Sequence, residues 1–201
     1  MLVVYIHGAN ATSESFTYIR EHVGGKDIAL EYSSSNGFYH NLSDMVEELE
    51  TKSDHLFFIA HSLGGIYALH LADHFKDRTI GGITIATPYG GSKAAELLKL
   101  VLPFNRLMKD ITPRSCPISE AKQITLPKNW VNIVPVVGHN PWMHEPNDGV
   151  VTIASMKYRD DMEFIEIPLN HYEAVISRKT VSIIKDRMSL INSDNKYKYE
   201  S

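Results

Sequence analysis

The sequence predicts an α/β fold built on a mostly parallel sheet of about six strands, with helices on both faces. Short runs of β-branched and aromatic residues alternate along the chain with stretches of helix-forming residues. Several strand-like runs are apolar at both odd and even positions, which is expected when helices cover both sides of a sheet. The 201 residues have ordinary apolar and charged fractions and contain no internal repeat, and a chain of this length and composition is most simply one globular domain.

The predicted strands share a short run rich in β-branched or aromatic residues. They are LVVYIHG (2–8), IALEYSS (28–34), LFFIAHS (56–62), IGGITIATP (80–88), WVNIVPVVG (130–138) and EFIEIPL (163–169). Helix-like stretches separate them. These are SESFTYIREHVG (13–24), NLSDMVEELETKSD (41–54), LGGIYALHLADHF (63–75), GSKAAELLKLVL (91–102) and HYEAVISRKTVSIIKDRM (171–188).

The stretch at 41–54 has the clearest helical pattern. Its apolar residues recur at spacings of three and four, as one buried helix face requires: Leu42, Met45, Val46 and Leu49. Two pairs can supply the start of this helix, namely Ser43 with Glu47 and Asn41 with Asp44.

The domain is expected to span residues 1–191. The segment at about 103–129 is weakly periodic and interrupted by prolines, so we expect an irregular, cap-like excursion that contributes to substrate binding. It is too short for a large lid, so little or no lid is predicted. Residues 192–201 are polar and are expected to form a frayed tail.

Charge and composition exclude several classes of partner. The net charge of −4, with histidine counted neutral, is mixed along the chain, which does not favour nucleic acid or an anionic membrane. The single cysteine, Cys116, cannot form an internal disulfide, which is compatible with a reducing compartment. There is no signal-like leader and no run near the roughly 18 to 20 apolar residues of a membrane span. We therefore expect a cytoplasmic protein without stable membrane insertion. A leader removed by processing and the oligomeric state are left open.

The serine in FFIAHSLGGIYAL lies between a strand-like and a helix-like run. In a parallel α/β sheet the carboxyl ends of the strands face a crevice where ligands bind, and Ser62 falls at such an end. The small residues Ala60, Gly64 and Gly65 permit a tight turn in which neighbouring backbone approaches closely. Such a turn would expose the hydroxyl of Ser62 and direct the amide of Leu63 at an oxygen bound beside it.

Three segments extend this pattern to a known superfamily. AHSLGG resembles the nucleophile elbow of the α/β-hydrolase superfamily, G-x-S-x-G, with Ala60 in place of the first glycine. IHGAN resembles the His-Gly element of lipases and esterases, which implies that the amides of Ala9 and Leu63 form the oxyanion hole. IATPYGGS (85–92) resembles the TPHxGS segment of bacterial triacylglycerol lipases and GPI-inositol-deacylase-like esterases, with Tyr89 where histidine is usual.

The segments NDGVVTIAS and IPLNHYEAV resemble the end of lipase-like hydrolases. There an acid follows the penultimate strand and a histidine follows the last one, in the order serine, acid, histidine. The corresponding residues are Asp148 and His171. The resemblance, which runs from Leu2 to Ile176, implies a compact α/β-hydrolase fold and a catalytic triad of Ser62, His171 and Asp148.

Other acids and histidines have simpler interpretations. Asp160 and Asp161 could replace Asp148 as the acid, but they lie in KYRDDME, which has the composition of a solvated turn. His61 is adjacent to Ser62 in sequence, so its side chain is expected to point elsewhere and pack. His7 is expected to stabilise the loop after the first strand.

A metal site has weak support. The candidate ligands are His139, His144, Glu145 and Asp148, and their spacing matches no strong ligand pattern. Glu173 resembles an acidic calcium ligand of some bacterial lipases, but no partner site is recognisable. No cofactor or metal is therefore predicted, and calcium at Glu173 is left open.

The function that the resemblance implies is serine-dependent hydrolysis of carboxylic esters, of esterase or lipase type, through an acyl-enzyme. The expected substrate is a small-molecule ester or a lipid-like ester. A thioesterase or acyltransferase with the same triad remains an alternative, as does a hydrolase-fold binding protein without activity. The physiological substrate and its acyl length are left open.

Overall fold

A computed structural model describes residues 1–90, 117–141 and 143–199 of the chain. Within them, six strands form one sheet in the order β2-β1-β3-β4-β5-β6, and every neighbouring pair is parallel. The strands are β1 Leu2–Ile6, β2 Asp27–Leu30, β3 Leu56–His61, β4 Thr79–Ile85, β5 Trp130–Pro135 and β6 Glu163–Ile167. The predicted sheet is confirmed, and its parallel strands bring their carboxyl ends to one edge.

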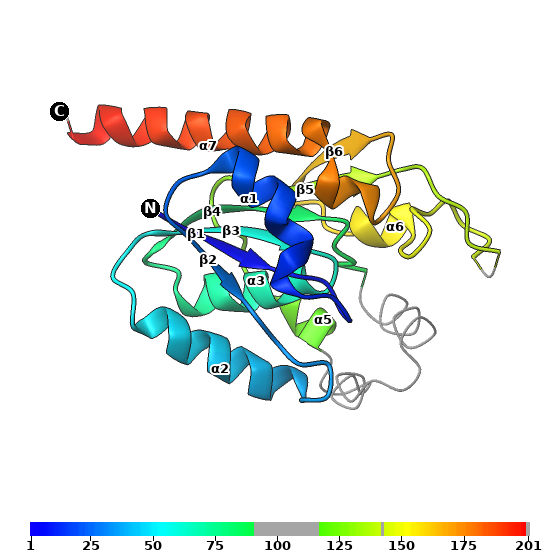
Figure 1. Cartoon of the computed structure of the whole chain (residues 1–201), viewed down its shortest axis with the longest axis horizontal. Helices are drawn as coiled ribbons and strands as arrows, with labels where there is room; N and C mark the ends of the chain where they lie inside the picture. The colour runs from blue at the N-terminus through cyan, green and yellow to red at the C-terminus, as the bar shows by residue number, and fades with distance from the viewer. Residues whose placement is uncertain (91–116, 142, 200–201) are drawn as a thin grey trace.

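Helices cover both faces of this sheet (Figure 1). One face carries α2 Phe38–Glu50, α3 Gly64–His74 and α5 Pro117–Ala121. The other carries α1 Thr17–Val23, α6 Ile153–Met156 and α7 Arg178–Tyr199. Two 3-10 helices, η1 Ser13–Phe16 and η3 Glu173–Ile176, lie beside each other and next to α1.

Adjacent residues of the central strands are buried in opposite cores. In β3, Phe58 and Ala60 belong to the cluster under α2 and α3, whereas Phe57 and Ile59 belong to the cluster under α1 and α7. All six residues of β3 are buried, because a strand covered on both faces has no side exposed to water. The apolar character at odd and even positions therefore predicted the layers correctly.

Helix α2 begins at Phe38, after the N-cap Gly37, so the starts predicted at Asn41 and Ser43 are both wrong. The reason is tertiary packing. The buried Phe38 ring stacks on Tyr67 of α3, with ring centroids 4.0 Å apart. This contact holds an extra turn of helix that no side-chain cap begins.

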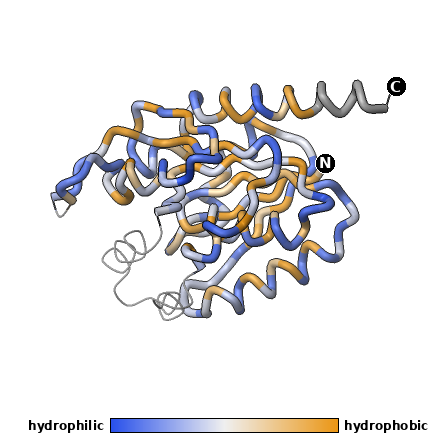
Figure 2. Tube along the Cα trace, turned by 180° about the vertical axis from the view of Figure 1, so that it is seen from behind, coloured by the Kyte–Doolittle hydropathy of each residue, from blue (hydrophilic) through white to orange (hydrophobic). Residues whose placement is uncertain are grey.

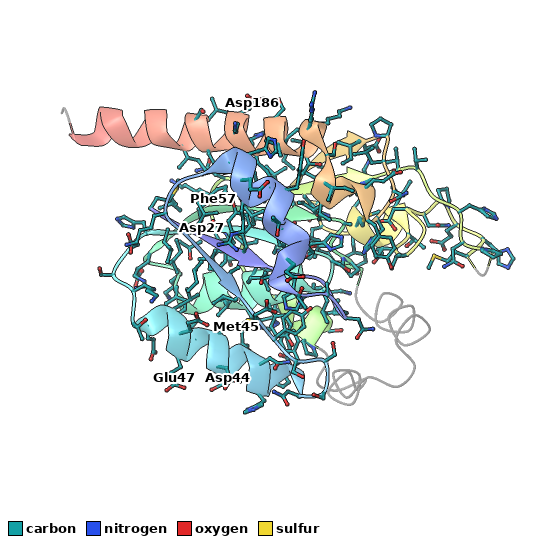
Figure 3. The ribbon with its side chains drawn as sticks, in the orientation of Figure 1. Asp27, Asp44, Met45, Glu47, Phe57 and Asp186 are labelled. Atoms are coloured by element: carbon teal, nitrogen blue, oxygen red, sulfur yellow. The ribbon has the colours of Figure 1, made fainter. Side chains whose placement is uncertain are left out.

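The amphipathic pattern of α2 is confirmed. Met45 points toward the sheet while Asp44 and Glu47 point away from it (Figure 3). Hydrophobic and hydrophilic residues accordingly alternate along this helix (Figure 2). Burial of the apolar stripe, rather than its end caps, supplies the stability of a helix of this kind.

The end of the chain differs from the expectation. Residues 171–188, predicted as one helix, form η3 and then α7, which begins at Arg178. The segment 192–199, predicted as part of a frayed tail, continues α7 as helix to Tyr199. It contains no proline or glycine that would stop a helix already begun.

Two predictions fall largely outside the described residues. The helix predicted at 91–102 is one, and residues 103–116 of the cap-like excursion are the other. The described remainder of the excursion contains α5 and the turns before β5. Among the described helices, none has the length and apolarity that crossing a bilayer requires.

Candidate active site

Ser62 lies on a strained turn between the end of β3 and the start of α3. Its φ angle is 52°, a left-handed value that costs a non-glycine residue about 1 kcal/mol or more. Backbone and side-chain bonds hold this conformation. The Ser62 amide donates to the carbonyl of Ile85 at 2.8 Å, and the hydroxyl of Thr87 donates to the Ser62 carbonyl at 3.1 Å.

Glycines behind Ser62 make the turn sterically feasible. A Cβ on Gly64 would lie 2.3 Å from the carbonyl oxygen of Ile6, and one on Gly65 would lie 2.0 Å from Oγ1 of Thr87. Both positions therefore exclude any larger residue. Ala60, where the superfamily pattern has glycine, is fully buried within β3, so the strand accommodates its methyl group.

His171 and Asp148 form a buried pair next to this turn. Nδ1 of His171 lies 2.7 Å from Oδ2 of Asp148, and the His171 amide donates to the Asp148 carbonyl at 3.0 Å. The other carboxylate oxygen, Oδ1, accepts the amides of Val150 and Val151 at 2.9 and 2.7 Å. Asp148 is completely buried, and these contacts fix both of its oxygens. Because the Nδ1 proton faces the carboxylate, Nε2 is the ring nitrogen left to act as a base.

The Ser62 and His171 side chains line one cavity of about 260 Å³. Its other lining residues are mostly small or apolar: Gly8, Ala9, Asn10, Ala11, Ser15, His61, Val150, Tyr172 and Val175. None of these carries a carboxylate, ammonium or guanidinium group. Within the described chain, no hydrogen bond joins Ser62 to His171. Hydrogen bonds between catalytic groups are often long without substrate and tighten when it binds.

Two backbone amides at the cavity have no acceptor in the described parts of the chain. They are the amides of Ala9, after β1, and Leu63, at the first turn of α3. The Gly8 carbonyl accepts from Nδ1 of His7 at 2.8 Å and from the Ala11 amide at 3.3 Å. In a trans peptide the N–H points opposite to the C=O of the same peptide bond. The Ala9 amide therefore points away from the two groups, of His7 and Ala11, that donate to the Gly8 carbonyl.

His7 stabilises the loop after β1, as expected. Its ring stacks on Tyr32, with centroids 4.2 Å apart, and its Nε2 lies 3.0 Å from the carboxylate of Glu31. The Tyr32 hydroxyl donates to the His7 carbonyl at 3.1 Å. Tyr32 lies in the strand predicted at 28–34, but β2 ends at Leu30, and the Tyr32 amide donates to Nε2 of His7 at 3.3 Å instead of to a neighbouring strand.

His61 does not point away from the site, so that prediction is wrong. The His61 ring lines the cavity, and its centroid lies 4.6 Å from that of the His171 ring. Nε2 of His61 is 3.1 Å from the His171 carbonyl oxygen. Sequence position alone misled the prediction, because it does not fix the direction of a side chain next to the left-handed turn at Ser62.

The other acids have different partners. Asp161 binds Arg159 through two bonds of 2.7 and 2.8 Å, and this hydrogen bonding to the guanidinium lowers the pKa of Asp161. Asp160 is exposed. Neither provides the buried contact with His171 that Asp148 makes.

Glu173 takes part in a local capping arrangement around His171. Its carboxylate accepts the Asn170 amide at 3.1 Å, while the Asn170 side chain accepts the amides of Tyr172 and Glu173 at 3.0 and 2.9 Å. This reciprocal pair is a capping box, and it orders the loop that carries His171. The sequence contained this signal, an asparagine followed three residues later by glutamate.

The candidate metal ligands are not brought together. His139, His144 and Glu145 are exposed, whereas Asp148 is buried against His171. Across the described ranges, no three His, Cys, Asp or Glu side chains gather in a way that could hold a metal ion.

Comparisons with known proteins identify the fold. No protein-family model and no curated protein sequence matches the chain. Solved structures do match. A Bacillus licheniformis lipase, BlEst2 in its mature form, has a TM-score of 0.71 at 16% identity, with 94% of this chain and 91% of that chain covered.

Two further structures give the same result. A structure described with LipS and LipT, two metagenome-derived lipolytic enzymes, has a TM-score of 0.68 at 15% identity and covers 96% of this chain and 93% of its own. The ydeN gene product from B. subtilis has a TM-score of 0.66 at 16% identity and covers 96% and 98%. The chain therefore has a compact α/β-hydrolase fold.

Proposed function

We propose that the protein is a serine hydrolase of carboxylic esters, with Ser62 as nucleophile, His171 as base and Asp148 as the acid that orients it. The observation that carries the proposal is the buried pair of His171 and Asp148, joined at 2.7 Å, which opens onto the cavity that Ser62 lines. A serine hydroxyl is a weak nucleophile near neutral pH and needs such a base beside it.

The reaction begins with attack of the Ser62 oxygen on the ester carbonyl while Nε2 of His171 removes the hydroxyl proton. The tetrahedral intermediate collapses as His171 gives that proton to the leaving alcohol, and an acyl-enzyme forms on Ser62. Water, activated by the same histidine, then releases the acid. Asp148 keeps its charge throughout and stabilises the imidazolium that forms in each half of the reaction.

The amides of Ala9 and Leu63 would stabilise the oxyanion of each tetrahedral intermediate. Their lack of an acceptor in the described chain supports this assignment, because unpaired amides near a buried site are rare. The N-terminus of α3 adds a favourable dipole at the same place. Removing one oxyanion donor typically costs about 3 to 4 kcal/mol of barrier.

The cavity favours a neutral ester with a small or apolar acyl group. Its lining has no carboxylate or permanent cation, and Ala9, Ala11, Val150 and Val175 offer apolar contact. Two of the structural neighbours are described as a lipase and as lipolytic enzymes, which agrees with a carboxylic ester as substrate.

Labelling with a fluorophosphonate, followed by hydrolysis of p-nitrophenyl esters of increasing chain length, tests the proposal. The intact protein should label once and hydrolyse the short esters, and Ser62→Ala should do neither. Ser15→Ala is the matched control, because Ser15 lines the same cavity and should be dispensable.

Faster turnover of matched thioesters would redirect the assignment to a thioesterase. A folded protein that neither labels nor hydrolyses any ester would refute it.

A further inference from the structure

His61 links the turn that carries Ser62 to the loop that carries His171. It is the last residue of β3, and its Nε2 lies 3.1 Å from the backbone carbonyl oxygen of His171. The ring of His61 also lies against the ring of His171, at 4.6 Å between centroids and with 53° between the planes. The two segments are 110 residues apart in sequence, so this contact is tertiary.

The hydrogen-bond partner determines the protonation of His61. A carbonyl oxygen only accepts, so Nε2 carries the hydrogen and Nδ1 is unprotonated in the neutral ring. Nδ1 faces Gly8, where a Cβ would lie only 2.9 Å away. Burial lowers the pKa of His61 well below its ordinary value; electrostatic interaction with His171 and His7 lowers it further, and the hydrogen bond to the His171 carbonyl opposes this only in part. A neutral His61 adds no charge that would oppose the imidazolium form of His171.

The main chain of His171 is thereby held on both sides. Its amide donates to the Asp148 carbonyl at 3.0 Å, and its carbonyl accepts from His61. The direction of the imidazole depends on this backbone. A displacement of about 1 Å in a catalytic group can cost about 100-fold in rate.

We propose that His61 is a positioning residue, whose Nε2–H bond to the His171 carbonyl aims the base at Ser62. This inference rests on the proposed function of Ser62 and His171. Packing alone would be served equally well by any ring of the same size, whereas positioning needs a hydrogen-bond donor at the Nε2 position.

Two amide substitutions separate these roles. In glutamine the amide nitrogen occupies nearly the position of histidine Nε2, whereas in asparagine it reaches only the Nδ1 position. His61→Asn should therefore lower kcat by about 10- to 100-fold with KM changed less than about twofold, and His61→Gln should restore most of kcat. His61→Phe replaces the imidazole by a somewhat larger ring without a donor and should behave like His61→Asn. Wild-type activity in all three variants would overturn the proposal, and so would a loss in His61→Gln as large as that in His61→Asn.

His70 provides the control. It is a half-buried histidine of α3 whose Nε2 contacts the Pro117 carbonyl at 2.9 Å, so it makes the same kind of bond away from the cavity. His70→Asn should leave kcat unchanged. A comparable loss in that variant would mean that His61 acts only through general stability.

A second measurement is independent of activity. The amide of His171 should exchange with solvent faster in His61→Asn and His61→Phe than in the wild type and His61→Gln, as followed by NMR. Unchanged exchange in His61→Asn would refute the link between the two residues. If the wild type proves inactive toward esters, the proposed function fails, while this exchange measurement still decides whether His61 holds the loop.

Discussion

Nδ1 of His171 and Oδ2 of Asp148 lie 2.7 Å apart in a fully buried contact, while the second carboxylate oxygen is occupied by two backbone amides. The two oxygens of Asp148 thus have different partners, and this difference predicts the effect of Asp148→Asn. In Asp148→Asn the amide oxygen would stay with the two backbone N–H groups, because only an oxygen can accept them. The NH₂ group would then face His171 and force its hydrogen onto Nε2.

Asp148→Asn should therefore lower kcat by about 10⁴-fold, the effect expected of the wrong imidazole tautomer, with little loss of stability. The measurement is the hydrolysis of a short p-nitrophenyl ester under saturating conditions. Asp160→Asn, at an exposed acid considered for the same role, should retain full activity. Near-normal turnover in Asp148→Asn would move the acid to another residue.

The protein should lose stability as the pH falls below neutrality. Burial lowers the pKa values of His61 and His70 below the ordinary 6.5, so the unfolded chain binds more protons than the native state in this range. The free energy of unfolding then decreases with falling pH, by at most about 1.4 kcal/mol per pH unit for each extra proton. The contribution of these two histidines to stability is complete above their pKa in the unfolded chain, and it is lost progressively as the pH falls from there toward their lower pKa in the folded state.

Acidic groups act at lower pH. Asp161 has its pKa lowered by Arg159, and its contribution disappears only below the ordinary carboxyl range. Urea denaturation between about pH 5 and pH 7 should therefore isolate the histidines. His61→Gln, which cannot titrate, should show a shallower pH dependence than the wild type. An equally steep dependence in that variant would assign the effect to other groups.

His7 should hold the Gly8 peptide as His61 holds the His171 main chain, but the order of activity of the asparagine and glutamine variants should be reversed. Nδ1 of His7, not Nε2, contacts the Gly8 carbonyl, so asparagine is here the substitution that preserves the donor. His7→Gln should lower kcat by less than the roughly 100- to 1,000-fold cost of a lost oxyanion donor, and His7→Asn should be milder. Steady-state kinetics with both variants checks the order. A reversed order would show that the Glu31 contact of His7 matters more.

Some features of the fold were readable from local pattern. The apolar character at both odd and even positions of LFFIAHS predicted burial on two faces, and the structure buries Phe57 and Phe58 in opposite cores. The spacing of Met45 and Leu49 predicted the inner face of α2. These predictions succeeded because periodicity reflects only whether a residue faces water or the core.

Other features depended on contacts that periodicity does not encode. The start of α2 follows from Phe38 stacking on Tyr67, and the end of β2 follows from Tyr32 stacking on His7. In both cases an aromatic side chain from a distant segment overrides the local signal. The polar end of α7 was mistaken for a tail because its composition says little about a helix that is already nucleated.

The sequence by itself determined the order of the six strands along the chain and the place of Ser62 at a strand-to-helix turn, because small residues and hydrophobic patterns are local properties. Only the tertiary structure decided that His171 contacts Asp148 and that His61 holds the His171 carbonyl. Parallel strands gather their carboxyl ends at one edge, so residues far apart in the chain become neighbours there. Their distances and donor directions exist only after the sheet has formed.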